Sequence, residues 1–93
     1  MAISFEKAAE QLHMKKEDLV EIGLKAYLRE KLRELRAEIT TIHLKYKVSS
    51  LEELDQKISK GRLSESDTFE DFTRLDYLES EEEKIRNIMG NWK

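Results

Sequence analysis

The sequence predicts an all-α protein, and three observations lead to that prediction. The 93-residue chain has no proline and only 3 glycines, and these are the residue types that form most turns. Its apolar residues recur every three or four positions, which is the period of an amphipathic helix. One such run extends without a break over 28–46. We therefore expect a helical hairpin or bundle, with one long helix over about 16–47, a short helix before it and two helices folded back after it.

The first helix is predicted over residues 4–13. Ser4 is a suitable N-cap, because its hydroxyl can accept a hydrogen bond from an unpaired backbone N–H of the first turn. Apolar residues then follow with helical spacing, namely Phe5, Ala8, Ala9 and Leu12. The stretch 14–16 interrupts this pattern, and the acids Glu17 and Asp18 suit the first turn of the next helix.

The long helix carries an apolar seam with a 3.5-residue period, which is typical of coiled coils. The seam has the spacing 4-3-4-3-4 and consists of Leu28, Leu32, Leu35, Ile39, Ile42 and Tyr46. Another helix must cover it, so we expect these residues to mediate self-association and the chain to form a homo-oligomer, in the simplest case a dimer. Gly23 costs this helix about 1 kcal/mol relative to alanine, and close approach of a neighbouring helix would explain its presence.

Two shorter patterns predict the helices that follow. Ser50 and Glu53 form a capping box at the start of the third helix, and Gly61 is its natural stop. The fourth helix is predicted to begin at Asp67 or Thr68. Its apolar side consists of Phe69, Phe72, Leu75, Leu78, Ile85, Met89 and Trp92. We expect residues 1–64 to form a helical core and oligomerisation region and residues 65–93 to form an acidic C-terminal arm.

Charge is distributed unevenly along the chain. Residues 1–49 have ten basic and eight acidic side chains, whereas residues 50–93 have seven basic and twelve acidic ones. On the long helix the basic residues form one stripe, made of Lys25, Arg29, Arg33 and Arg36, and the acids form another, made of Glu30, Glu34 and Glu38. Like charges on one face repel, so we expect compensation from outside the helix. The acidic fourth helix, a second copy, nucleic acid or a charged protein could supply it.

Several classes of site are poorly supported. The absence of cysteine excludes disulfides, thiolate zinc sites and a cysteine nucleophile. His13 and His43 have no second histidine at helical spacing, and no glycine-rich phosphate loop is present. We therefore expect no metal, no cofactor and no enzymatic activity. Since no apolar run approaches the length of a membrane span and no signal peptide is evident, we also expect a cytoplasmic protein without membrane contact.

Residues 9–28 combine two helical patterns joined by a short basic stretch. The diagnostic positions are Leu12, Met14, Glu17, Leu19, Leu24, Tyr27 and Leu28. In these positions the chain resembles the helical part of ribbon-helix-helix antitoxins. With its long helix, the stretch 46–54 and the segment 69–72, it is also similar to small archaeal proteins that look like antitoxins. The ribbon strand of that family is not evident in residues 1–7, so its DNA-reading residues are not carried over.

This resemblance implies a non-enzymatic protein-binding module that neutralises a cognate toxin, often a ribonuclease, through its acidic C-terminal segment. The residues expected to bind the partner are Phe69, Asp71, Phe72, Tyr77, Glu79 and Trp92. A first alternative is a self-associating structural coiled coil or bundle, whose C-terminal helix covers its own core. A second is a DNA-binding regulator, although a pI near 5.5 disfavours it. Its candidate nucleic-acid contacts would be Lys15, Lys16, Arg29 and Arg33.

Overall fold

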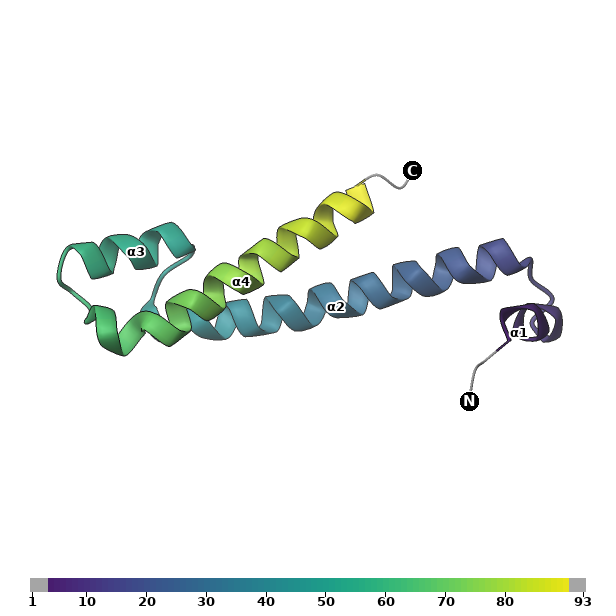
Figure 1. Cartoon of the computed structure of the whole chain (residues 1–93), viewed down its shortest axis with the longest axis horizontal. Coiled ribbons are helices and arrows are strands. Elements are labelled where there is room, and N and C mark those ends of the chain that lie inside the picture. The colour runs from purple at the N-terminus through teal and green to yellow at the C-terminus, as the bar shows by residue number, and fades with distance from the viewer. Residues whose placement is uncertain (1–3, 91–93) are drawn as a thin grey trace. The chain divides into compact units, whose positions relative to one another are not determined.

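The computed structural model describes residues 4–90, which form four helices and no strand. Their bounds are α1 Phe5–Gln11, α2 Lys16–Tyr46, α3 Leu51–Ser59 and α4 Glu65–Gly90 (Figure 1). The all-α prediction is confirmed, including the long helix and the two helices that follow it. Trp92 lies outside the described residues. The chain divides into two compact units between Lys31 and Leu32, and α2 contributes to both.

The second unit contains the core. Ion pairs join the C-terminal half of α2 to α4, which runs antiparallel to it, and α3 packs against α4 (Figure 1). Leu54, Leu75 and Leu78 have no exposed surface. The other buried apolar residues of this unit are Leu35, Ile39, Ile42, Val48 and Ile85. A single chain therefore buries the seam residues Leu35, Ile39 and Ile42. Self-association through the seam stays a prediction.

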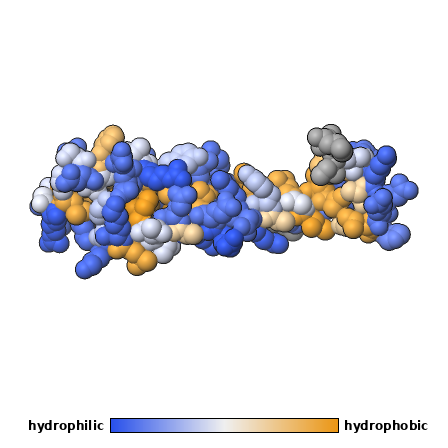
Figure 2. Space-filling view, turned by 90° about the horizontal axis from the view of Figure 1, so that it is seen from below, coloured by the Kyte–Doolittle hydropathy of each residue, from blue (hydrophilic) through white to orange (hydrophobic). Residues whose placement is uncertain are grey.

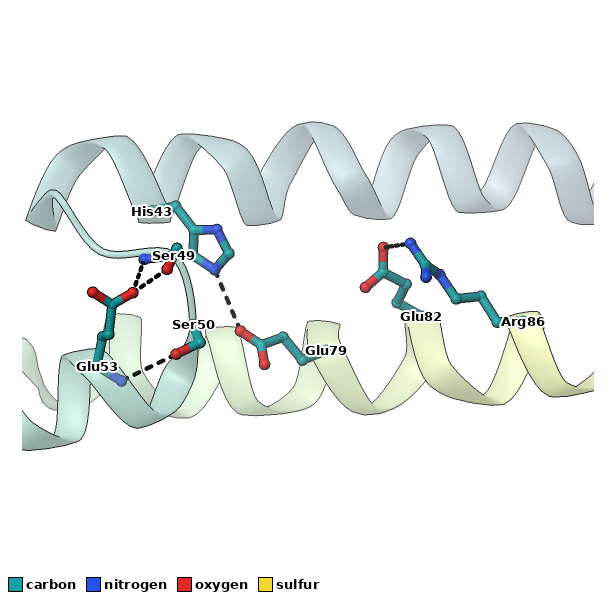
Figure 3. Close-up of polar contacts among 7 residues, drawn as sticks. All are labelled: His43, Ser49, Ser50, Glu53, Glu79, Glu82 and Arg86. Carbon is teal, nitrogen blue, oxygen red and sulfur yellow. Dashed lines mark hydrogen bonds and ion pairs between the residues drawn. The ribbon is translucent and has the colours of Figure 1, made fainter.

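Capping interactions fix the start of α3. Ser50 Oγ accepts a hydrogen bond from the Glu53 backbone N–H at 3.1 Å, as the capping box predicts. The Glu53 carboxylate, however, accepts hydrogen bonds from the backbone N–H of Ser49, at 2.7 Å, and from the Ser49 hydroxyl (Figure 3). These bonds hold the pKa of Glu53 below its usual range. On α3, Lys57 donates from Nζ to the Tyr46 carbonyl at 2.7 Å, which caps the end of α2.

Three turns contain a residue with positive φ within two residues of a helix end, at His13, Lys47 and Gly61. After α3, the Arg62 N–H donates to the Lys57 carbonyl at 2.9 Å, which completes the turn that Gly61 permits. The prediction of Gly61 as the stop of this helix is confirmed. His13 and Lys47 adopt the same left-handed conformation although they carry a Cβ, at a cost of about 1 kcal/mol each.

The start of α4 differs from the prediction. The helix begins at Glu65, before the expected Asp67 or Thr68, because Ser64 acts as its cap. Ser64 Oγ accepts a hydrogen bond from the Asp67 N–H at 3.4 Å, and the Ser64 carbonyl accepts one from the Thr68 hydroxyl. Thr68 is thereby buried, whereas Phe69 is 63% exposed and does not belong to the buried side of α4.

The first unit has little core of its own. Within residues 4–31, only Ala9 and Leu28 are buried. Polar contacts hold α1: Ser4 Oγ accepts from the Lys7 N–H at 3.3 Å, and Lys16 pairs with Glu6 at 2.6 Å. Six large apolar side chains of this unit are exposed, namely Phe5, Leu12, Val20, Ile22, Leu24 and Tyr27. Figure 2 shows apolar residues gathered over this region, at the right of the view.

Candidate protein-interaction site

A small cleft between α3 and the start of α4 contains two of the predicted partner-binding aromatics. Phe69 and Phe72 of α4 and Ile58 of α3 provide its apolar surface, and its volume is about 140 Å³. Asp55 and Glu65 contribute carboxylates to the same lining. Phe69 projects into solvent because Thr68 occupies the buried position at this turn. The cleft thus combines an exposed aromatic ring with negative charge.

Tyr77 lies further along α4 and is 53% exposed. Its ring is 5.6 Å from the Arg74 guanidinium, a cation–π contact, and its hydroxyl donates to Glu81 at 3.4 Å. Tyr77 and Phe69 are eight residues apart, so both lie on the outer side of α4, away from Leu75 and Leu78.

Asp71 was expected to bind a partner, but it faces α2. Its carboxylate accepts a hydrogen bond from Lys45 Nζ at 2.7 Å and another from the Tyr46 hydroxyl. The Lys45 ammonium, and after it the Tyr46 hydroxyl, hold the pKa of the Asp71 carboxyl below its usual range. Burial and then the Asp71 carboxylate raise the pKa of Tyr46. Asp71 is therefore engaged in joining α4 to the end of α2.

Glu79 also points toward α2, where its carboxylate lies 3.3 Å from His43 Nε2 (Figure 3). Further along the same helix pair, Glu82 accepts a hydrogen bond from Arg36 Nε at 3.1 Å, and it also lies 3.4 Å from Arg86 Nη2. One ion pair has the reverse polarity, with the base on α4 and the acid on α2: Arg74 donates to Glu38 at 2.7 Å. For these residues the charge compensation expected from the sequence comes from α4 of the same chain.

The candidate nucleic-acid contacts are divided between the two units: Lys15, Lys16 and Arg29 belong to the first, and Arg33 belongs to the second. Lys16 is paired with Glu6. Lys15 lines a surface depression together with Asp18 and Glu21, whose negative charges oppose phosphate binding. Two further candidates, Arg29 and Arg33, lie on α2 and have exposed side chains. The basic stripe is also partly neutralised within α2 itself, because Lys25 Nζ lies 3.2 Å from the Glu21 carboxylate. Nucleic-acid binding stays a prediction.

Another surface was not recognised as a candidate site in the sequence. Val20, Gly23, Leu24 and Tyr27 lie on one face of α2, and the side chains of all but the glycine are large, apolar and exposed. The signal that could have revealed them is their spacing of i, i+3, i+4 and i+7. The sequence explanation for Gly23 was a neighbouring helix, yet a Cβ there would meet no heavy atom within 4 Å outside the helix backbone.

Residues 4–90 contain no group of three or more histidine, aspartate or glutamate side chains placed to hold a metal ion. Over the same part of the chain, no helix has the length and apolarity needed to cross a membrane. The absence of a metal and of enzymatic activity stays a prediction.

A family model described as the Uncharacterized protein MJ0235 family matches residues 1–93. The chain belongs to this family. It is also similar to Uncharacterized protein MJ0235 of Methanocaldococcus jannaschii, with 33% identity over 73 residues, which is 78% of this chain and 89% of that relative. No solved structure matches the chain significantly.

Membership in the MJ0235 family confirms the expected kinship with small archaeal proteins.

Proposed function

We propose that this chain is a non-enzymatic protein-binding module of antitoxin type, which holds a basic protein partner, such as a ribonuclease toxin, through its acidic C-terminal helix. The observation that carries the proposal is the cleft of Phe69, Phe72 and Ile58 with the carboxylates of Asp55 and Glu65 in its lining. Exposed aromatic side chains are the residues that most often dominate binding energy at protein interfaces.

Charge supports the choice of a basic partner. A nucleic-acid-binding surface on a ribonuclease is basic, and acidic side chains around an apolar anchor attract such a surface and orient it. The partner contacts are assigned to Phe69, Phe72 and Tyr77. Asp71 and Glu79 have a positioning role, because their bonds to Lys45, Tyr46 and His43 hold α4 against α2.

The test is co-expression of the full chain with the product of the neighbouring gene, followed by co-purification and a growth-rescue assay. We expect a complex and relief of toxicity, and we expect Phe69→Ala to weaken binding at least about tenfold. Leu44→Ala is the matched control, because Leu44 is 72% exposed but lies on α2 away from the cleft. Failure to form a complex would favour a self-contained structural bundle, and equal loss in both variants would contradict the assigned site.

A further inference from the structure

One face of α2 in the first unit has three large apolar side chains that are exposed in the described part of the chain. Val20, Leu24 and Tyr27 are 42%, 45% and 62% exposed, and they line up along about two turns of helix. Apolar side chains at this spacing are those that a surface helix normally turns toward a neighbour. Among the described residues, none supplies that neighbour at Gly23, in the middle of the face.

Gly23 indicates what kind of neighbour this face of α2 would contact. A glycine inside a helix destabilises it relative to alanine, and here there is room for a Cβ in the isolated chain. Glycine has a use at this position if another backbone approaches closely, because only glycine removes the side chain from the contact. The expected occupant is therefore a second helix that crosses α2 at Gly23.

Charges at the two ends of the apolar face indicate that the neighbouring helix is α2 of a second copy. Glu17 precedes the apolar residues and Lys31 follows them, so the two charges are about 21 Å apart along the axis. The midpoint between Glu17 and Lys31 is residue 24, and the midpoint between Val20 and Tyr27 lies between residues 23 and 24. If two copies of α2 cross antiparallel at this point, Glu17 of each copy lies opposite Lys31 of the other. A parallel pair would place like charges opposite each other.

We propose that Val20, Gly23, Leu24 and Tyr27 form the interface of an antiparallel homodimer, in which α2 of one copy crosses α2 of a second copy at Gly23. The interface is isologous, since the same patch serves both copies. It involves only about two turns of each helix, so it falls among small interfaces, and we expect weak, concentration-dependent association. This surface differs from the 28–46 seam, much of which the chain covers with its own helices.

The first test is sedimentation velocity of the full chain over a wide range of protein concentrations. The wild-type chain should pass from monomer to dimer. Leu24→Glu should weaken association about tenfold or more, because it places charge in the apolar contact. Ile22→Glu is the matched control: Ile22 is also exposed, at 56%, but lies on another side of the same helix turn. Its dissociation constant should stay within about twofold of wild type.

The second test uses the charges at the ends of the face. Glu17→Lys alone and Lys31→Glu alone should each weaken the dimer, because both contacts of the symmetric pair become repulsive. The double variant should restore association, since it exchanges the charges. A parallel dimer predicts no loss in the single variants.

Circular dichroism of each variant separates loss of association from loss of helix. A chain that stays monomeric throughout the range would overturn the proposal, as would a dimer that tolerates Leu24→Glu or that Ile22→Glu weakens equally.

Discussion

Residues 32–90 form an apolar core around Leu54, Leu75 and Leu78 and pair charges between helices, whereas residues 4–31 leave most of their large apolar side chains in solvent. In the second unit, α4 supplies both the apolar cover and the countercharges for its part of α2. In the first unit, α1 is short and covers little of its part of the same helix. The surroundings of one long helix therefore change along its length. One segment contributes to the core, and the other leaves large apolar side chains exposed.

The largest expected effect comes from removing a core side chain of the second unit. Leu75→Ala should lower the free energy of unfolding by about 2–5 kcal/mol, because Leu75 has no exposed surface. Ile22→Ala in the first unit should cost less than about 1 kcal/mol, since its side chain is already in contact with water. Urea unfolding followed by circular dichroism measures both variants. Comparable losses would contradict the division between a core and an exposed surface.

Gly23→Ala should act in opposite directions on folding and association. In dilute solution it should stabilise the monomer by about 1 kcal/mol, because alanine favours the helix and a Cβ at Gly23 meets nothing there. The same Cβ should obstruct the crossing of two helices and weaken the dimer. Thermal melts at low concentration and sedimentation at high concentration provide the two readouts. If the substitution strengthened both folding and association, Gly23 would not be the crossing point.

His13 and Lys47 both have positive φ at the end of a helix, one in each unit, so substituting each by glycine compares the two units. Lys47→Gly should stabilise the protein by about 0.5–1 kcal/mol, because glycine adopts this conformation without the Cβ penalty. Since Lys47 lies in the packed unit, the gain should appear as a higher melting temperature of the whole unit. His13→Gly should instead increase hydrogen-exchange protection mainly in α1. Equal effects on global melting would show that the first unit folds cooperatively with the second.

The smallest expected effect concerns the pairing of Asp71 with Lys45 and Tyr46. Because these partners lower the pKa of Asp71, the ionised carboxylate contributes stability above about pH 4, and this contribution is lost as pH falls through the folded-state pKa. Asp71→Asn should therefore be less stable than wild type at neutral pH, by less than about 1 kcal/mol since water screens the pair. The two unfolding curves should converge under acidic conditions. A difference independent of pH would exclude the charge as its source.

Much of the fold could be predicted from local sequence. Helical periodicity located α2, and the short-range hydrogen bonds of Ser50 and Gly61 identified the ends of α3. The predicted start of α4 was wrong because Ser64 and Asp67 are both good caps. The choice between them depends on which of Thr68 and Phe69 is buried. Packing against other helices decides which of the two is buried, and a local sequence pattern carries no information about that packing.

The candidate site was predicted only in part for the same reason. Composition identified the acidic aromatic segment, but it could not separate Phe69 and Tyr77, which face solvent, from Asp71 and Glu79, which face α2. The apolar face around Gly23 was visible as spacing in the sequence. What the structure adds is that no segment among the described residues occupies the space beside Gly23.

The most direct measurement uses the absence of cysteine from the chain, which lets a single introduced thiol report one contact. Leu24→Cys and Ile22→Cys would each be oxidised under mild conditions, and the disulfide-linked dimer would be quantified. A disulfide needs Cα atoms about 4.4–6.8 Å apart, so it forms efficiently only where the two copies meet. We expect rapid cross-linking of Leu24→Cys and little of Ile22→Cys. Equal cross-linking of the two variants, or none in either, would contradict a dimer that crosses at Gly23.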